Sequence, residues 1–173
     1  MENQVNSKQF IVNNGILLGV ASIVLSLILY ATGNHLTPHW SVSLISAALF
    51  IGLIVFGTKK FKEANGGFMS WGQGVKVGVG IAVLAGLIIT IYQYVFMNFI
   101  EPEYMAQMME IQNQGFIDGG MTEEQIEAAN KMGESFRSPF MVAAMGIIMY
   151  AIGGFIVSAI TSAIMKKSEE EQY

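Results

Sequence analysis

Uninterrupted apolar runs dominate the pattern of hydrophobic and polar positions along this chain. Four runs of 18 to 26 residues contain at most one charged side chain each: residues 10–30, 40–57, 75–96 and 140–165. A helix of about 20 residues covers roughly 30 Å, the thickness of the hydrocarbon core of a bilayer. A water-soluble helix rarely stays apolar on every face. The pattern therefore predicts an all-α integral membrane bundle with four spanning helices.

The first run could also be a cleaved signal peptide, since Lys8 precedes it. The apolar part of a signal peptide usually has roughly 7–15 residues, and a small-residue cleavage site follows it. This run has 21 residues, and the sequence from its last residue onward, Tyr-Ala-Thr-Gly-Asn, offers no such site. We therefore interpret the run as a retained membrane span.

The composition agrees with a membrane protein and excludes several other classes. Of 173 residues, 53% are hydrophobic and 13% are charged, whereas ordinary globular chains have roughly 25% charged residues. These shares exclude a disordered chain and a typical soluble domain. The chain contains no cysteine, which excludes disulfide frameworks, thiolate metal sites and cysteine catalysis. We expect a single membrane domain over residues 1–173.

Basic residues are concentrated in every second segment that flanks the predicted spans. The tail 1–9 contains Lys8, three lysines lie between the second and third spans, and the tail 166–173 begins with two more. The connection 97–139 instead contains eight acidic and two basic residues. Lysine and arginine favour the cytoplasmic side of a membrane. The pattern predicts that both tails are cytoplasmic and that residues 97–139 are extracytoplasmic.

The outer connection has the signals of two short amphipathic helices. Pro102 is typical of a helix start, and apolar residues follow it at helical spacing, with Gly115 as the expected stop. Thr122 followed by Gln125 is a capping-box pattern, in which two side chains satisfy backbone N–H groups at a helix start. A turn at residues 118–120 joins the two expected helices.

Small residues repeat every three or four positions along three of the spans and form narrow, smooth stripes. They are Gly15 and Gly19 in the first span, Gly74, Gly78, Ala82 and Gly86 in the third, and Gly154 and Ser158 in the fourth. Such stripes allow two helices to approach closely in a membrane. The stripes can pack against each other within one chain, or one of them can pair with a second copy.

The connection between the second and third spans combines a glycine turn with basic side chains. Residues 65–67 read Asn-Gly-Gly, and Ser70 is placed to cap the third helix. Four lysines lie near this helix start: Lys59, Lys60, Lys62 and Lys76. They can serve as a positively charged membrane anchor, or they can bind the anionic headgroup of a lipid.

Methionine and histidine are the remaining candidates for metal binding. Three methionines fall at helical spacing in the outer connection: Met105, Met108 and Met109. Thioether sulfur suits Cu(I), but methionine at this spacing more often packs against apolar neighbours. Pro38 interrupts any helix between His35 and His39, which argues against a histidine pair. We therefore predict no metal site and no cofactor.

The segment 57–78 resembles part of a known family of bacterial membrane proteins. It places a basic stretch before an Asn-Gly-Gly-aromatic turn and a Ser-Trp-Gly-Gln helix start. Aromatic residues that end the third span, and a Pro-Phe pair before the last, fit the same pattern. On these residues the chain is similar to the domain of unknown function 4199 family, mostly from Bacteroidota. Trp71 and Gly74 depart from the usual Phe and Ala. The resemblance implies a four-helix inner-membrane protein and brings no known activity.

The chemistry of the spans points away from catalysis. No Asp, Glu, Arg or His lies in the central part of any span, and no nucleophile–base pair is recognisable. We expect a non-enzymatic inner-membrane protein that acts through protein contacts, as a scaffold, accessory subunit or assembly factor. The alternative is an oligomeric conduit or carrier for a small solute or lipid. Nucleic acid is excluded as a partner because no basic face with interleaved aromatic residues is present.

The acidic residues of the outer connection are the expected contact surface. Three of them cluster at the start of the second outer helix: Glu123, Glu124 and Glu127. Such a surface suits a basic protein partner or a divalent cation, and it is poorly suited to anionic headgroups. We expect membrane lipids around the spans, and either a second copy or another membrane protein as the partner.

Overall fold

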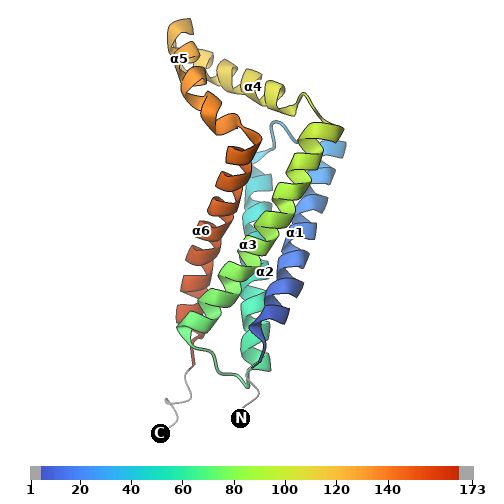
Figure 1. Ribbon diagram of the computed structural model, residues 1–173, viewed down its shortest axis with the longest axis vertical. Helices are drawn as coiled ribbons and strands as arrows, with labels where there is room; N and C mark the ends of the chain where they lie inside the picture. Colours follow the sequence, from blue (N-terminus) through green and yellow to red (C-terminus); the bar gives the residue numbers. More distant parts are fainter. Residues whose placement is uncertain (1–4, 168–173) are drawn as a thin grey trace. The chain divides into compact units, whose positions relative to one another are not determined.

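The computed structural model describes residues 5–167, which fold almost entirely into helices (Figure 1). The long helices are α1, Ser7–Ala31; α2, Trp40–Ala64; α3, Trp71–Val95; and α6, Pro139–Met165. Between α3 and α6 lie the π-helical turn η1, Phe96–Ile100; α4, Tyr104–Asp118; α5, Glu123–Glu134; and the 3-10 turn η2, Ser135–Arg137. The four long helices are long and apolar enough to cross a membrane. The prediction of an all-α membrane bundle with four spans is therefore confirmed, and the chain is a multi-pass membrane protein.

The described residues form two compact units. The first contains residues 5–89 and 147–167, and the second contains residues 90–146. In the first unit, α1, α2 and most of α3 and α6 lie side by side (Figure 1). The second unit contains the end of α3, both short helices and the start of α6. Parts of the predicted cytoplasmic tails, at 1–4 and 168–173, lie outside the described residues.

Helices of the first unit that follow each other along the chain run in opposite directions. The rings of Phe10, near the start of α1, and Phe61, near the end of α2, are 5.7 Å apart between centroids. The backbones of Met69, just before α3, and Lys167, just after α6, exchange two hydrogen bonds of 3.0 Å. The first and last described residues therefore lie at the same end of this unit, as an even number of antiparallel spans requires.

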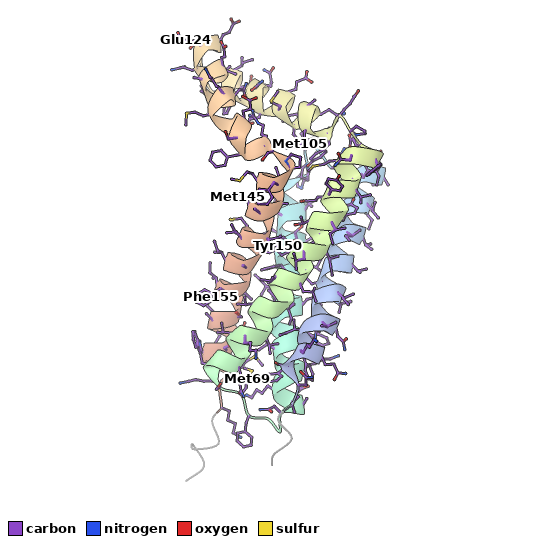
Figure 2. The ribbon with its side chains drawn as sticks, viewed as in Figure 1. Met69, Met105, Glu124, Met145, Tyr150 and Phe155 are labelled. Atoms are coloured by element: carbon purple, nitrogen blue, oxygen red, sulfur yellow. The ribbon has the colours of Figure 1, made fainter. Side chains whose placement is uncertain are left out.

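The core of the first unit is apolar and centres on α3, which contributes more buried residues than α1, α2 or α6. The apolar side chains buried in this core are Leu18, Ile54, Phe61, Met69, Val77, Ile81, Ala82 and Ala85. Large side chains of α6 are mostly exposed; Figure 2 shows Phe155 directed away from the neighbouring helices. Exposure of large apolar side chains along a spanning helix is expected where the helix faces lipid.

α2 continues well beyond Gly57, where the predicted membrane span ends, and reaches Ala64. The last turns contain charged side chains, and Lys59 Nζ pairs with a Glu63 carboxylate oxygen at 3.8 Å, four residues further on. Lysine and glutamate are good helix formers, so a loss of apolar character does not interrupt the helical backbone. The end of an apolar run marks the edge of the hydrocarbon layer, which need not coincide with the end of the helix.

In the second unit, α4 continues past Gly115, where the sequence pattern predicted its end. The backbone N–H of Gly119 still donates to the Gly115 carbonyl at 3.0 Å. The helix ends at Asp118, and Gly120 then adopts a φ of 81°, a left-handed conformation that glycine reaches without strain. The expected stop at Gly115 is wrong because one glycine inside a helix costs only about 1 kcal/mol relative to alanine.

The approach to α4 also differs from the prediction. Pro102 lies in a turn before the helix, which begins at Tyr104. A π-helical turn precedes it, closed by a 2.8 Å hydrogen bond from the Glu101 N–H to the Phe96 carbonyl. Tyr104 packs edge-on against Phe96, with 5.7 Å between ring centroids. Burial raises the pKa of the Tyr104 phenol, and the Glu101 carboxylate raises this pKa further.

Candidate functional site

The small residues of α3 and α6 face each other in a regular antiparallel register. Each step of four residues along α3 is matched by four in the opposite direction along α6. The facing pairs in the first unit are Gly74 and Ser162, Gly78 and Ser158, Ala82 and Gly154, and Gly86 and Tyr150. A Cβ atom added at Gly78 would overlap Ser158, and one added at Gly86 would lie 2.9 Å from the Tyr150 Cβ. These four pairs define the α3–α6 interface.

The stripe of α1 packs against other residues of α3. A Cβ atom added at Gly15 would lie 2.9 Å from the side chain of Leu84, and one added at Gly19 would lie 2.9 Å from Ile88. Large side chains of α3 thus occupy the space that the two glycines leave. Every predicted helix-packing residue therefore contacts another helix of the same chain, and α6 covers the stripe of α3.

Hydroxyl groups accompany the glycines along the α3–α6 interface. Ser158 is fully buried and donates to the Phe155 carbonyl at 3.2 Å, within its own helix. Ser162 is also fully buried, but its hydroxyl has no hydrogen-bond partner within residues 5–167. Because Gly74 lies directly opposite Ser162, the small size of serine explains its presence here better than its hydrogen-bonding capacity.

The predicted headgroup-contact lysines, Lys59, Lys60, Lys62 and Lys76, lie around the connection between α2 and α3. Two of them have partners within α2. Lys59 pairs with Glu63, and the Lys60 Nζ atom lies 4.4 Å from the centroid of the Phe56 ring. The others lie in the last turn of α2 and, exposed, near the start of α3. Lys59, Lys60 and Lys76 are exposed, and Lys62 is half-buried. The lysines therefore form a basic region along two helix ends.

The start of α3 is capped by its own residues. The Ser70 Oγ atom accepts from the Gln73 N–H at 3.2 Å, and the Gln73 Oε1 atom accepts from the Ser70 N–H at 2.8 Å. This reciprocal pair is a capping box, and the predicted capping role of Ser70 is confirmed. The turn before it requires glycine, since Gly66 and Gly67 have φ values of 67° and 86°. Two of the backbone groups that could bind an anion are therefore already satisfied.

In the second unit, Glu123, Glu124 and Glu127 are exposed on α5, and Figure 2 shows Glu124 pointing outward at the tip of this helix. The predicted capping box is confirmed. Thr122 Oγ1 accepts from the Gln125 N–H at 3.4 Å, and Gln125 Oε1 accepts from the Thr122 N–H at 2.9 Å. Carboxylates in the first turn also stabilise a helix through its dipole. The acids thus support α5 and remain accessible to a partner.

Arg137 connects the elements of the second unit. Its guanidinium donates to the Asn130 backbone carbonyl at 3.1 Å, to Asn130 Oδ1 at 3.0 Å and to Gln112 Oε1 at 3.3 Å. The Asn130 side chain donates in turn to Asn113 Oδ1 at 3.0 Å. One charged side chain and three amide side chains therefore hold α4, α5 and η2 together.

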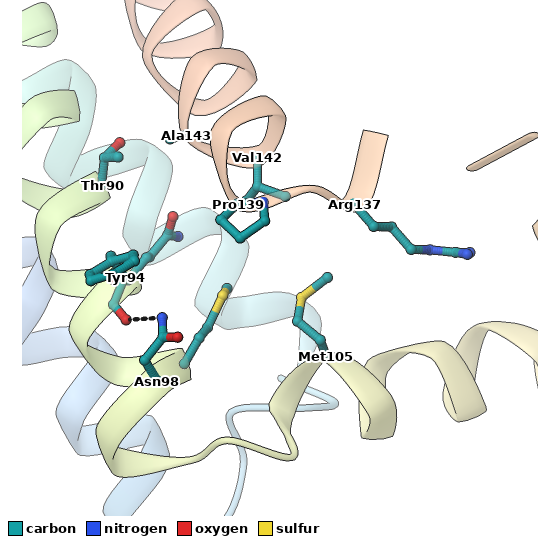
Figure 3. Close-up of a pocket in the computed structure, with 10 residues that line it drawn as sticks. Thr90, Tyr94, Asn98, Met105, Arg137, Pro139, Val142 and Ala143 are labelled. Atoms are coloured by element: carbon teal, nitrogen blue, oxygen red, sulfur yellow. Dashed lines mark hydrogen bonds between the residues drawn. The ribbon is translucent and has the colours of Figure 1, made fainter. Parts of the chain in front are cut away.

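A cavity of about 170 Å³ lies in the second unit, where the end of α3, the start of α4 and the start of α6 converge (Figure 3). Its apolar wall includes Met97, Met105, Pro139, Val142 and Ala143, and its polar side chains are Thr90, Gln93, Tyr94, Asn98 and Arg137. Figure 3 shows Met105 reaching from α4 toward Pro139, and Asn98 donating to the Tyr94 carbonyl at 2.7 Å. The cavity is therefore mainly apolar, with amide and hydroxyl groups on the α3 side.

Two groups of polar residues that line this cavity are noticeable in the sequence, but helical spacing alone does not show that they lie close together. Gln93 and Asn98 are amides at the end of an otherwise apolar span, and Arg137 is one of two bases in an acidic connection. Their convergence depends on the π-helical turn and on the turn before α4. The π-helical turn has no recognisable side-chain pattern, and Pro102 in the second turn predicted only a helix start.

The methionines of α4 do not share one environment. Met105 lines the cavity, whereas Met109 is exposed on the helix surface. No group of three or more His, Asp or Glu side chains that could hold a metal ion occurs within residues 5–167.

Comparison with known families gives a match over most of the chain. The sequence model of the family described as "Protein of unknown function (DUF4199)" matches residues 13–167. This range includes α2, α3 and α6 and all but the first turns of α1. Neither the curated proteins nor the solved structures contain a match to the chain.

Proposed function

The chain belongs to the DUF4199 family, whose description assigns no activity, and we propose from its own geometry that it is a non-enzymatic protein of the bacterial inner membrane that acts by contact. Its role would be that of a scaffold, accessory subunit or assembly factor. The α3–α6 interface is the observation that supports this proposal. Each of its four facing pairs contains a glycine in close contact with the other helix, so within the first unit these two helices leave no room for a solute path between them.

Two exposed charged surfaces are available for contact. The first unit offers the lysines around the connection between α2 and α3. The second unit offers the carboxylates of α5, Glu123, Glu124 and Glu127. Charged surfaces of opposite sign attract different partners and orient their approach. The acidic surface suits a basic segment of another membrane protein.

The proposed orientation places both termini in the cytoplasm. The first and last described residues lie at one end of the first unit, and the lysine-rich connection follows the end of α2 there. Lysines favour the cytoplasmic side. The connection between α3 and α6 would then be extracytoplasmic.

Reporter fusions test this orientation. A fusion after Tyr173 is expected to be active only with a cytoplasmic reporter, and an insertion at Asn113 only with an extracytoplasmic reporter. The same insertion in a chain with all lysines of the α2–α3 connection changed to Gln is the control, because it should show mixed orientation. The opposite reporter activities at the two positions would contradict the proposal.

The acidic contact surface is tested by replacing Glu123, Glu124 and Glu127 together with Gln. A basic partner captured by the wild type at low salt should be lost from this variant, since attraction between exposed charges weakens as charge is removed or salt is added. The measurement is capture from membranes in mild detergent at two salt concentrations, with the captured proteins identified by mass spectrometry.

A matched variant keeps the same change in net charge but leaves the tip of α5 intact. In this variant Gln replaces Glu103, Glu110 and Glu134, which are also exposed. This variant is expected to retain the partner. Equal capture by the wild type and by the α5 variant would show that the acids only keep the surface solvated.

A second candidate function is that of an oligomeric conduit or carrier for a small solute or lipid. The cavity of the second unit is the observation that favours it. Oligomerisation through the α3 stripe is not favoured, because α6 occupies that stripe. Light scattering in detergent tests this candidate, which requires a mass of more than one chain.

A further inference from the structure

The cavity of the second unit opens where small residues stop facing each other. The last close pair in this unit is Thr90 and Gly146; a Cβ atom added at Gly146 would lie 3.8 Å from the Thr90 Oγ1 atom. In the same register, one step of four residues further on, Tyr94 of α3 stands opposite Val142 of α6. Both residues are far larger than glycine, and both line the cavity. The two helices cannot stay in close contact at such a pair, so a hollow forms between them.

The level of this cavity along its spanning helix is that of the membrane interface. The candidate span Trp71–Ile100 contains 30 residues, or about 45 Å of helix, which matches a whole bilayer with its headgroup regions. Residues 90–98 therefore lie near one polar edge of the bilayer. Tyr94, Phe99 and Phe140 are 57%, 75% and 78% exposed, and exposed aromatic rings are typical of helix surfaces at the lipid interface. The cavity thus borders on lipid.

The walls of the cavity select an uncharged, largely apolar occupant. Met97, Met105 and Val142 present only carbon and sulfur. Arg137 also lines the cavity. Its guanidinium is held by Asn130 and Gln112, and Figure 3 shows it directed away from Pro139. A volume of about 170 Å³ is comparable with apolar cavities of about 150 Å³ that bind benzene. It accommodates a short segment of a hydrocarbon chain, not a whole lipid.

Polar groups on one side of the cavity give such a chain an orientation. An amide nitrogen has two hydrogens, so Asn98 keeps one donor after bonding to the Tyr94 carbonyl. Gln93 contributes a further amide, and Thr90 contributes a hydroxyl. These donors suit an ester carbonyl, the group that joins an acyl chain to the glycerol of a phospholipid.

We propose that this cavity binds one acyl chain of a membrane phospholipid near its ester group. The apolar wall takes the first methylene groups of the chain, and Gln93 and Asn98 donate to the ester carbonyl. The bilayer is the source of the ligand because Tyr94, an exposed aromatic residue of the interface region, lines the cavity. This site goes beyond the contact function and does not depend on it.

The test uses the purified full-length protein in a nonionic detergent, titrated with palmitoyl-oleoyl phosphatidylethanolamine and followed by native mass spectrometry. The wild type is expected to bind one lipid per chain. Ala143→Phe fills the cavity and should weaken this binding about tenfold or more, equivalent to about 1.4 kcal/mol. Met145→Phe is the matched control, because Met145 is exposed on the same helix and should keep the wild-type affinity.

Two further experiments test separately the contributions of the ester carbonyl and of the headgroup to lipid binding. Asn98→Leu and Gln93→Leu together should weaken binding severalfold, since the ester carbonyl loses its donors. Glycerophosphoethanolamine, which has the headgroup but no chains, should not compete. If Ala143→Phe does not fold, as judged by circular dichroism, Ala143→Leu takes its place.

Three results would overturn the proposal. They are unchanged lipid binding by the cavity-filling variant, equal losses in the Ala143 and Met145 variants, and competition by the chain-free headgroup. Because the measurement needs only the isolated protein and a lipid, it is independent of any protein partner and of the membrane orientation.

Discussion

At the scale of single residues, the glycines of this protein differ sharply in how closely they are enclosed. Gly78 faces Ser158 across the α3–α6 interface, whereas an added Cβ at Gly52 of α2 would meet nothing within 4 Å. Gly78→Leu should force α3 and α6 apart and lower the free energy of unfolding by about 1–3 kcal/mol or more. Gly52→Leu should be neutral or slightly stabilising, since leucine favours helix more than glycine.

Unfolding by sodium dodecyl sulfate, followed by circular dichroism, compares these two variants with the wild type. Light scattering on the same samples gives the mass. Loss of stability at unchanged mass is expected for a contact within one chain. Equal stability of the two variants would show that the interface does not determine how the helices pack.

The two buried serines of α6 offer a second comparison at this scale. The Ser162 hydroxyl has no partner within residues 5–167, while Ser158 donates to its own helix. A buried hydroxyl without a partner costs about 1–3 kcal/mol. Ser162→Ala should therefore raise the midpoint of thermal unfolding in detergent, and Ser158→Ala should leave it unchanged or lower it. A drop for Ser162→Ala would mean that its hydroxyl is bonded in the folded protein.

At the scale of elements, the arrangement of α4, α5 and η2 depends on Arg137. Hydrogen bonds to a charged group contribute about 1.5–3 kcal/mol each, and Arg137 makes three of them within the second unit. Arg137→Gln should therefore speed backbone amide exchange in α5 by about tenfold or more. Lys131→Gln removes the same charge from the exposed surface of α5 and serves as the control. Hydrogen exchange followed by mass spectrometry measures the exchange rates of α5 in both variants. Equal rates in the two variants would contradict this role of Arg137.

The end of α5 and the turn η2 that follows it share an apolar surface that the second unit leaves uncovered. Met132 is 80% exposed and Phe136, four residues later, is 59% exposed. Exposed apolar groups shortly before a spanning helix suit the membrane interface. Because the chain has no cysteine, Met132→Cys provides a single site for a polarity-sensitive dye. In nanodiscs its emission should be blue-shifted relative to the same dye at Glu127→Cys. Identical emission at the two positions would place Met132 in water.

Capping signals were the most reliable sequence signals at this scale. Ser70 and Thr122 both cap as predicted, because a cap depends on residues only three positions apart. The stop at Gly115 failed because glycine permits a helix end without enforcing one. The apolar pattern did not predict that α2 extends to Ala64, because charged residues end an apolar run but can continue a helix.

At the scale of the whole molecule, four apolar runs were sufficient to predict four spans and the all-α class, since the bilayer fixes their length and requires backbone hydrogen bonds within each helix. The stripes showed which faces could pack, but the rotation of each helix decides which stripe meets which. The pairing of Gly78 with Ser158 was therefore not predictable. The cavity could not be predicted for the same reason. It depends on Tyr94 and Val142 facing each other, and only the folded chain defines the register of α3 against α6.

The α3–α6 interface also has a consequence in time. A ribosome adds about 5–20 residues per second, so α3 enters the membrane several seconds before the residues of α6 that will cover it. During that interval the small-residue face of α3 has only lipid or a helper protein against it. Closing of the first unit therefore waits for α6, the last of its four spanning helices to be synthesised.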